Sequence, residues 1–337
     1  MQPLPVAVVG CGIFGDIHAT TYAHFDQSEL VLVCDLDENR AKAAAEKFNC
    51  DYTTRVEDVA DDKRVKAVSI VTPEFAHRDP CVMLAGAGKH IFVEKPLATS
   101  SDDAAAIVKA VRDAKVIGGI DFHNRYHPAF RTFQKRRSQG KLGEVRMILA
   151  RLSDRLEVAT KWFSWSGKSG PQWFLGSHLV DTACWLMGAE PVRVYADASK
   201  GVLSGRGIDC YDCIQIHLSF PDGLATLESS WILPDAWPSV ADFSVSIQTT
   251  TSRVDVQGSN HGMVEARPEG YGWPFLNGLT PIGEDDWGYF NLPIHDFVRA
   301  VNRGQEAPVP VEVGLKNVRI IEAAMRSIRE QKAIELT

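Results

Sequence analysis

Hydrophobic residues in the first 122 positions gather in short runs, and amphipathic stretches separate these runs. The runs predict strands at 6–10, 30–35, 67–72, 90–94 and 116–120, with a further short strand near Tyr52. The stretches between them predict helices at 13–25, 38–48, 76–88 and 100–114. Continuous apolar strands separated by amphipathic helices are typical of a parallel sheet covered on both faces. The first part of the chain is therefore predicted to be a doubly wound α/β domain.

The pattern changes after residue 122. Helices are predicted at 128–138 and at about 172–187, among segments that alternate apolar and polar positions and so indicate strands with one face in water. These strands are predicted at 144–153, 192–199, 212–220, 223–232, 242–250 and 253–257. We therefore expect an α/β domain at 1–122 and an α+β domain with an open-faced, mainly antiparallel sheet at 123–313. A last helix at 314–331 is expected to pack back on the first domain.

A glycine-rich turn joins the first predicted strand to the first predicted helix, and it reads Gly10-Cys11-Gly12-Ile13-Phe14-Gly15. Gly10 permits a tight turn, Gly12 lets the backbone approach a pyrophosphate, and Gly15 allows close packing of helix on strand. Asp35 ends the second predicted strand, where a carboxylate can accept hydrogen bonds from ribose hydroxyls and repel a 2′-phosphate. The turn is therefore predicted to bind NAD in preference to NADP. The alternative is a glycine-rich turn that binds no ligand.

Length and charge narrow the choice of function. A chain of 337 residues is long enough for two domains that each bury a core. The net charge is −7 with acids and bases interspersed, so no nucleic-acid partner is expected. No leader pattern and no apolar stretch of the ~20 residues that a membrane span needs is present, which indicates a cytoplasmic protein with no membrane partner. Among seven scattered cysteines, Cys210 and Cys213 form a lone CxxC without a second pair, so no metal site is expected.

The fifth predicted strand ends in Glu94, Lys95 and Pro96. Ligands of open α/β sheets collect outside the carboxyl ends of the strands. A partly desolvated lysine at such a place, close to a bound nicotinamide, can take part in proton transfer. The residues alone leave this interpretation open against a lysine that is simply solvated.

Several motifs follow one another in a recognisable order. They are the turn at 10–15, Thr72-Pro73 with His77, Glu94-Lys95-Pro96, Asn124-Arg125-Tyr126, and Gly176-Ser177-His178 with Asp181. With this set the chain resembles the Gfo/Idh/MocA family of nicotinamide-dependent oxidoreductases over essentially its whole length. The resemblance implies a Rossmann domain and an open-faced sheet domain with a catalytic cleft between them. It also implies a sugar, cyclitol or related polyol as substrate, and sheet faces that pair subunits into a homodimer or homotetramer.

The resemblance further implies residue roles. Lys95, typically followed by a cis peptide bond to Pro96, is expected beside the nicotinamide, and Lys95 and His178 are the expected catalytic residues. The expected cofactor-binding residues are Gly10, Gly12, Ile13, Phe14, Gly15, Asp35, Thr72, Pro73, His77, Glu94 and Lys95. The expected substrate-binding residues are Lys95, Arg125, Trp162, Trp173, Phe174 and His178. Two alternatives stay open: His77 as a packed histidine, and the aromatic stretch at 161–174 as packing between domains or subunits.

One position departs from the family pattern. Members that oxidise a secondary alcohol usually carry an aspartate four residues before the catalytic histidine, whereas this chain has Phe174 before His178. In a first interpretation, His178 still acts as general base with Lys95, and the phenyl ring shapes a pocket for a less polar or larger substrate. In a second, Asp181 takes over the orientation of the imidazole. In a third, ordinary catalysis is lost. The first is favoured because the lysine and histidine that can move a proton are both present.

The sequence therefore predicts an NAD-dependent oxidoreductase that acts on a secondary alcohol of a sugar, cyclitol or glycoside. Hydride transfer to nicotinamide would accompany proton transfer by Lys95 and His178. One alternative is an enzyme that keeps NAD tightly bound and uses it for redox-neutral elimination or epimerisation of a sugar derivative. The other is an NAD-binding sensor without catalysis.

Overall fold

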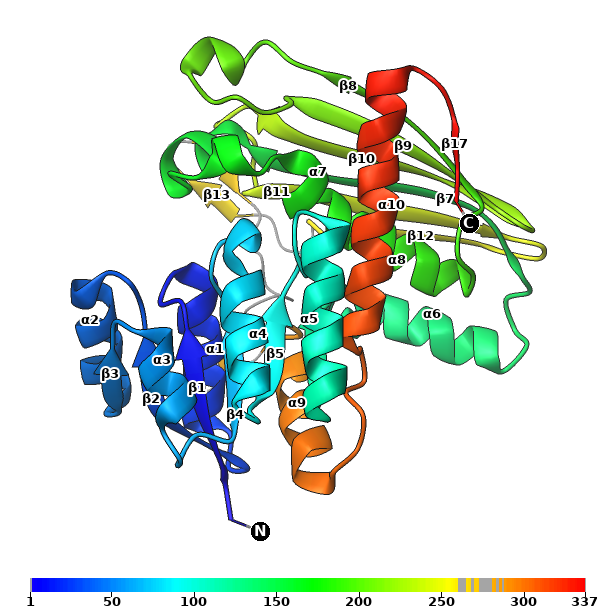
Figure 1. The fold of residues 1–337 in the computed structure, drawn as a ribbon. Coiled ribbons are helices and arrows are strands. Elements are labelled where there is room, and N and C mark those ends of the chain that lie inside the picture. The colour runs from blue at the N-terminus through cyan, green and yellow to red at the C-terminus, as the bar shows by residue number, and fades with distance from the viewer. Residues whose placement is uncertain are drawn as a thin grey trace. The chain divides into compact units, whose positions relative to one another are not determined.

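The computed structural model describes residues 2–259, 265–267, 270–272, 281–282, 285–286 and 288–336 (Figure 1). The chain divides into two compact units. The first consists of residues 1–123 and 281–318, and the second of residues 124–280 and 319–337. Because the chain crosses between the units more than once, each unit is built from separate stretches of sequence.

The first unit contains a six-stranded sheet in the order β3-β2-β1-β4-β5-β6, and all of its neighbouring strands are parallel. The strands are β1 (Leu4–Val9), β2 (Ser28–Cys34), β3 (Asp51–Thr53), β4 (Ala67–Ile70), β5 (His90–Glu94) and β6 (Gly118–Asp121). The helices of this unit are α1 (Ile13–His24), α2 (Glu38–Phe48), α3 (Val56–Asp61), α4 (Arg78–Gly86), α5 (Ser101–Ala114) and α9 (Leu292–Arg303). The strand order reverses at β1, which confirms the doubly wound Rossmann topology.

Side-chain caps explain why the helices of this sheet begin where they do. Asp37 accepts hydrogen bonds from the backbone amides of Asn39 and Arg40 and so starts α2. Ser100 accepts one from the amide of Asp103 at 3.1 Å and starts α5. Such caps satisfy amides that the first turn of a helix leaves unpaired. Gly12, which caps α1, has no side chain to do so.

The second unit contains a seven-stranded sheet in the order β12-β11-β7-β10-β9-β8-β17. Its neighbours are antiparallel except for β7 and β10, so the predicted open-faced, mainly antiparallel sheet is confirmed. The strands are β7 (Val145–Arg155), β8 (Arg193–Ser199), β9 (Cys213–Phe220), β10 (Gly223–Leu233), β11 (Ala241–Thr249), β12 (Arg253–Gln257) and β17 (Ile334–Glu335). The helices are α6 (Pro128–Ser138), α7 (Pro171–Phe174) and α8 (Gly176–Met187). Short pairs join β13 (Glu265–Arg267) to β14 (Gly270–Gly272) and, in the first unit, β15 (Pro281–Ile282) to β16 (Asp285–Asp286).

The boundary of the units differs from the predicted division at residues 122 and 313. Residues 281–318 belong to the first unit, because Ile294, Phe297 and Val298 of α9 are buried in the same core cluster as Val6 and Val8 of β1. The apolar side of α9 completes the core of the nucleotide-binding sheet. The sequence analysis did not predict this helix.

The predicted last helix is α10 (Val311–Glu330). It does not lie on the first unit alone, because residues 311–318 belong to that unit and residues 319–330 to the second. Charged residues recur along it, among them Glu312, Lys316 and Glu322. Within the described part of the chain, no helix combines the length and the apolar character needed to cross a lipid bilayer.

Candidate active site

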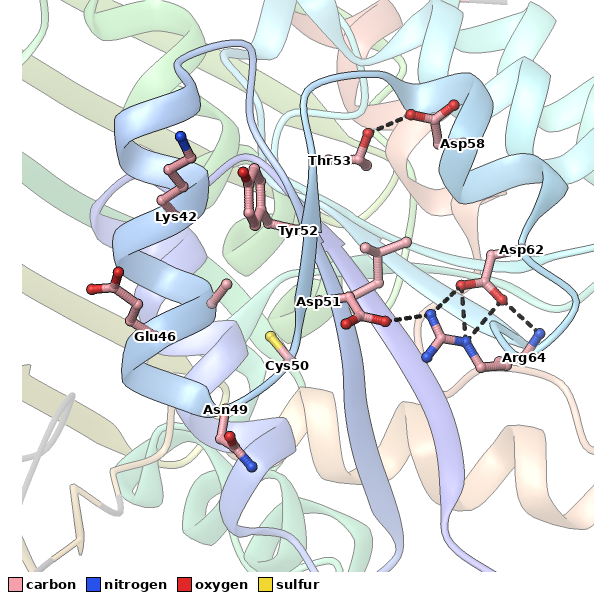
Figure 2. Close-up of a pocket in the computed structure, with 12 residues that line it drawn as sticks. Lys42, Glu46, Asn49, Cys50, Asp51, Tyr52, Thr53, Asp58, Asp62 and Arg64 are labelled. Atoms are coloured by element: carbon pink, nitrogen blue, oxygen red, sulfur yellow. Dashed lines mark hydrogen bonds and ion pairs between the residues drawn. The ribbon is translucent and has the colours of Figure 1, made fainter.

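A recess of about 770 Å³ lies at the edge of the first unit, between α2, β3 and α3, and none of the expected site residues lines it (Figure 2). Several of its charged groups are already paired. Arg64 donates to Asp51 at 2.7 Å and to Asp62 at 2.7 Å, and the Lys42 ammonium lies 5.7 Å from the ring centre of Tyr52.

Of the three glycines in the turn, Gly10 and Gly15 have no room for a side chain, whereas Gly12 has. Gly10 has φ +102°, and a Cβ there would lie 2.5 Å from the carbonyl oxygen of Val71. A Cβ at Gly15 would lie 1.9 Å from the carbonyl oxygen of Gly10. A Cβ at Gly12 would meet nothing within 4 Å, so open space adjoins the backbone there. This turn, followed by the N-terminus of α1 at Ile13 and Phe14, fits the diphosphate of a dinucleotide.

Polar groups at the ends of β2 and β4 also fit a dinucleotide. Asp35 accepts hydrogen bonds from the amides of Cys11 and Asp37, each at 2.8 Å, and each carboxylate oxygen keeps a second acceptor site for a ribose hydroxyl. The buried hydroxyl oxygen of Thr72 has no hydrogen-bond partner among the residues that the structure describes. Leu36, beside Asp35, is 90 % exposed and offers an apolar surface to a base. Leu36 was not among the expected site residues, although it directly follows the acid that ends β2.

Lys95 lies at the carboxyl end of the neighbouring strand, β5. Its peptide bond to Pro96 is cis, as the resemblance implies. Its side chain is nearly buried, at 5 % exposure, and its Nζ lies 6.0 Å from the ring centre of Phe14. Its backbone amide donates to Oε2 of Glu94 at 3.0 Å. Lys95 therefore borders the residues that begin α1, within the same unit as the glycine turn.

His77 supports this strand end from the side. Its Nδ1 lies 2.9 Å from the carbonyl oxygen of Pro96, and its Nε2 lies 2.8 Å from that of Thr72. The imidazole is buried, and both of its nitrogens face main-chain oxygens. His77 thus ties the segment after β4 to the segment after β5, which matches the packed-histidine interpretation.

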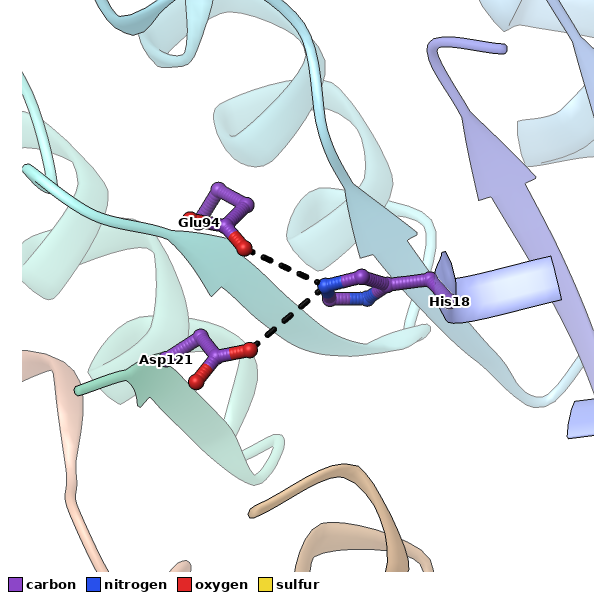
Figure 3. Close-up of side chains that lie close together, drawn as sticks. All are labelled: His18, Glu94 and Asp121. Carbon is purple, nitrogen blue, oxygen red and sulfur yellow. Dashed lines mark hydrogen bonds and ion pairs between the residues drawn. The ribbon is translucent and has the colours of Figure 1, made fainter. Parts of the chain in front are cut away.

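Beneath Lys95 lies a buried polar cluster that the sequence analysis missed, formed by His18 of α1, Glu94 of β5 and Asp121 of β6 (Figure 3). His18 Nε2 lies 3.3 Å from Oε1 of Glu94 and 3.5 Å from Oδ2 of Asp121. These separations allow the imidazole to form hydrogen bonds with both carboxylates. Glu94 and Asp121 are register partners at the ends of the adjacent parallel strands β5 and β6.

In the second unit, His178 lies in the first turn of α8 and is buried. The predicted helix at 172–187 is interrupted: α7 ends at Phe174 and α8 begins at Gly176. Pro171 and Gly176 favour separate helix starts here, so Phe174 and His178 do not share one regular helix. The spacing of four residues therefore does not by itself place them on one helical face.

Arg125 and Asp181 form a buried ion pair in the same unit. Arg125 donates from Nε to Oδ2 at 2.9 Å and from Nη2 to Oδ1 at 2.6 Å. Burial alone would lower the pKa of Arg125, but the charge of Asp181 outweighs it and raises that pKa. Both carboxylate oxygens already face the guanidinium, so the geometry does not favour Asp181 as the group that orients His178.

Comparison with known proteins agrees with these arrangements. Residues 4–122 match the oxidoreductase family with an NAD-binding Rossmann fold, and residues 130–263 match the C-terminal domain of the same GFO/IDH/MocA family. The chain belongs to the Gfo/Idh/MocA family. It is thus an oxidoreductase with NAD as its cofactor.

Individual relatives of this Gfo/Idh/MocA protein are distant. Inositol 2-dehydrogenase of Rhizobium meliloti is 28 % identical over 337 residues, which covers 98 % of each chain. The 2,7-anhydro-N-acetylneuraminate hydratase of Escherichia coli is 27 % identical over 235 residues, covering 68 % of this chain and 62 % of that protein. The crystal structure of myo-inositol 2-dehydrogenase from Lactobacillus plantarum has a TM-score of 0.87 at 21 % identity, and each chain is covered completely.

Phe174 belongs to an aromatic cluster of the second unit. The ring centre of Phe174 lies 5.1 Å from that of Phe163, 6.4 Å from that of Trp165 and 5.7 Å from that of Trp231. Of the other two aromatic residues expected at the substrate, Trp173 is buried and Trp162 is 45 % exposed. Phe163, Trp165 and Phe174 are half-buried, so their rings form the partly open side of the cluster.

Proposed function

We propose that this protein is an NAD-dependent dehydrogenase that oxidises a secondary alcohol of a sugar, cyclitol or glycoside. The observation that carries the proposal is Lys95, nearly buried at the carboxyl end of β5 and close to Phe14 at the start of α1. The inositol dehydrogenases among its relatives act, by their names, on polyols with secondary alcohols. Oxidation of a secondary alcohol by NAD releases a proton, and a lysine beside the nucleotide-binding turn can take part in that proton transfer.

The proposed roles follow from what each side chain can do with a proton. When NAD is bound, its nicotinamide accepts a hydride. The alcohol must then lose a proton, which His178 takes as general base. Lys95 polarises the alcohol oxygen or shares its proton. Arg125, Phe174 and Trp162 are proposed to contact the rest of the substrate, and Arg125 does so while paired with Asp181.

Asp35 is proposed to select NAD over NADP. It ends β2 with one oxygen on the amide of Cys11 and the other on that of Asp37. A 2′-phosphate at this position would place its negative charge against the carboxylate, whereas a 2′-hydroxyl can donate to it. NAD is therefore expected to bind much more tightly than NADP.

Phe174 is proposed to favour a substrate with an apolar part, such as a glycoside with an aromatic aglycone. The half-buried rings of Phe163, Trp165 and Phe174 offer flat surfaces that pack against C–H faces and aromatic groups. An aspartate in place of Phe174 would instead accept hydrogen bonds from hydroxyl groups. Phenyl glucoside is thus expected to have a lower KM than methyl glucoside, and Phe174→Ala is expected to reduce this difference.

The decisive assay follows NADH absorbance with NAD and a panel of inositols, free sugars and glycosides. Lys95→Ala and His178→Ala are expected to lower kcat by at least about 100-fold, the usual contribution of a positioned proton-transfer group. Lys109→Ala and His24→Ala, which remove exposed residues of the same types, serve as matched controls. Wild-type rates in both Lys95→Ala and His178→Ala would refute the proposed roles. Failure of the whole panel, despite tight NAD binding, would favour a sensor.

A redox-neutral reaction with resident NAD is the second candidate, favoured by the relative that is named as a hydratase. It predicts NAD that co-purifies with the protein and product formation without added NAD. The dehydrogenase predicts that turnover depends on added NAD and produces NADH in proportion to product.

We further propose that the open sheet face pairs subunits. Leu149, Tyr195 and Leu224 are exposed large apolar residues on β7, β8 and β10. Tyr195 and His217 also lie side by side across β8 and β9, with ring centres 6.4 Å apart. Light scattering should therefore give the mass of a dimer or tetramer, and Leu149→Lys with Leu224→Lys should give a monomer.

We also propose a cytoplasmic location. All seven cysteines are free thiols, which fits a reducing compartment such as the cytoplasm.

A further inference from the structure

The buried cluster beneath Lys95 connects several elements of the nucleotide-binding unit through one imidazole. His18 of α1 reaches Glu94 and Asp121 with Nε2, and its Nδ1 lies 3.0 Å from the hydroxyl of Ser69 on β4. The Ser69 hydroxyl lies 2.7 Å from that of Tyr22. All five side chains are buried. Nothing in the binding of NAD by the glycine turn requires this arrangement.

The hydrogen bonds show which protons the cluster holds. An ionised carboxylate only accepts, so the Nε2–H of His18 is shared between Glu94 and Asp121. Nδ1 faces the hydroxyl of Ser69, which can accept a hydrogen bond from Nδ1–H and donate one to the hydroxyl oxygen of Tyr22. A doubly protonated imidazole is thus fully satisfied. Its positive charge then offsets the negative charge of the buried carboxylates.

The ionisation of these groups agrees with that picture. Burial alone would lower the pKa of His18, but its hydrogen bonds to Asp121 and Glu94 outweigh burial and raise the pKa to about 9. Burial would raise the pKa of Glu94, yet the hydrogen bond from His18 outweighs it and lowers that pKa. Burial raises the pKa of Asp121 to about 7. At neutral pH the cluster therefore contains a cationic His18 and an ionised Glu94.

Glu94 transmits this state to Lys95. Its Oε1 faces His18, while its Oε2 accepts the backbone amide of Lys95 at 3.0 Å. On the other side of Lys95, the carbonyl of Pro96 is held by His77. The positive charge of Lys95 in turn acts on the pKa of Glu94 and of Asp121, so charge coupling is mutual. The lysine is thereby fixed in its backbone and coupled in its charge to one carboxylate.

The groups that face His18 come from each element packed against it. The titratable and charged ones are Tyr22 on α1, Glu94 and Lys95 at the end of β5, Asp121 at the end of β6, and His123 after it. Burial lowers the pKa of His123 to about 3, which keeps it neutral. His18 is therefore the cation that lies between the two carboxylates.

We propose that His18 is a positioning residue for Lys95: it keeps Glu94 ionised, and the ionised Glu94 orients the Lys95 main chain and stabilises its ammonium form. This inference rests on the proposed function, in which Lys95 takes part in proton transfer. Without His18, two buried carboxylates would face each other and take up a proton, because like charges in such a site do not both ionise. Glu94 would then lose the charge that acts on Lys95.

The test measures the ionisation of Lys95 directly and needs no substrate. The full-length protein is labelled with 13C at lysine Cε, the Lys95 resonance is assigned with Lys95→Arg, and its shift is followed against pH. A unit charge at roughly 6 Å and an effective dielectric of about 20 moves such a midpoint by about two pH units. Since Asp121 retains part of the charge, His18→Gln is expected to lower the midpoint by about one unit.

Three variants sharpen the test. Glu94→Gln removes the whole charge of Glu94 and is expected to lower the midpoint by about two units, and the double variant is expected to lower it no further, because His18 acts through Glu94. Tyr22→Phe removes a hydrogen bond from the same cluster but no donor of the carboxylates, and it should leave the midpoint unchanged. If His18→Gln does not fold, Glu94→Gln and Asp121→Asn carry the comparison.

A Lys95 midpoint that stays within about 0.2 units in His18→Gln and Glu94→Gln would overturn the inference, even if both variants are less stable. An additive shift in the double variant would also overturn it. The proposed function fails in a different way, through Lys95→Ala with undiminished turnover. A shifted midpoint together with active Lys95→Ala would leave the coupling intact and remove its catalytic meaning.

Discussion

Asp181→Asn is expected to destabilise the protein by about 3 kcal/mol. The guanidinium of Arg125 donates two hydrogen bonds to Asp181, and the exposed fractions of the two side chains are 17 % and 2 %. Removing one partner of a buried ion pair leaves the other charge without compensation, which costs about 3–5 kcal/mol. The asparagine oxygen can still accept one hydrogen bond, so the cost falls at the lower end of that range.

Urea unfolding at pH 7, followed by tryptophan fluorescence, measures this cost. Trp185 is a suitable reporter because the guanidinium of Arg125 lies 5.8 Å from its ring centre. At an unfolding entropy of about 2.1 cal/mol/K per residue, 3 kcal/mol lowers the Tm of the 337-residue chain by roughly 4 °C. Arg125→Met combined with Asp181→Leu removes both charges and is expected to cost less than Asp181→Asn alone.

The exposed Lys109–Asp113 pair on α5 provides the control. Asp113→Asn is expected to leave the unfolding curve unchanged, because exposed pairs contribute little. A loss below about 1 kcal/mol in Asp181→Asn would refute the reasoning, since the pair would then behave as a surface pair. An equal loss in the charge-free double variant would indicate that packing, rather than the unpaired charge, determines the cost.

Three further outcomes are expected. Asp35→Asn should lower the ratio of NADP to NAD dissociation constants at least about tenfold by removing the repulsion, as cofactor titration would show, and an unchanged ratio would contradict the role of Asp35. Gly15→Ala should abolish NAD binding and lower Tm, because its Cβ would lie 1.9 Å from the carbonyl oxygen of Gly10. Gly12→Ala should fold normally, because a Cβ there meets nothing within 4 Å. Normal NAD binding by Gly15→Ala would count against this turn geometry. The free energy of unfolding should fall as pH rises from about 6.5 to 9, because His18 with its pKa raised to about 9 binds a proton in the folded state that the unfolded chain has released. The slope from this group is at most about 1.4 kcal/mol per pH unit, and it should disappear in His18→Gln.

The nucleotide-binding sheet was predictable because its central strands β1, β4 and β5 are apolar on both faces. Such strands read as continuous runs, and each of the six lies within a few residues of its predicted place. The glycine turn made the prediction of a dinucleotide-binding fold more specific, because the conformation of Gly10 and the close contact at Gly15 exclude residues other than glycine. Local chemistry therefore determined both the fold class of this part and the position of its ligand-binding edge.

Other features depended on contacts that are distant in sequence. The helix α9 was missed, and only its burial against β1 explains why residues 281–318 belong to the first unit. The parallel pairing of β7 with β10 likewise follows from sheet order, which alternation does not reveal. Asp121 becomes informative only when β6 is known to lie beside β5.

The candidate site shows the same limit. Lys95 was a candidate from its place at the end of a predicted strand, and His178 was found through a resemblance. Both are buried in the structure, and burial does not test their roles. His18 was missed because a single polar residue on an apolar helix carries no spacing signal. Its importance arises from three other elements that bring Ser69, Glu94 and Asp121 to its ring.

The continuous helix α10 has a consequence for how the protein melts. Residues 311–318 belong to one compact unit and residues 319–330 to the other. If either unit unravelled alone, the helix would have to end in mid-course, and up to four backbone carbonyls or amides would lose their partners. Denaturation is therefore expected to proceed as a single cooperative event, with one calorimetric peak for the whole polypeptide.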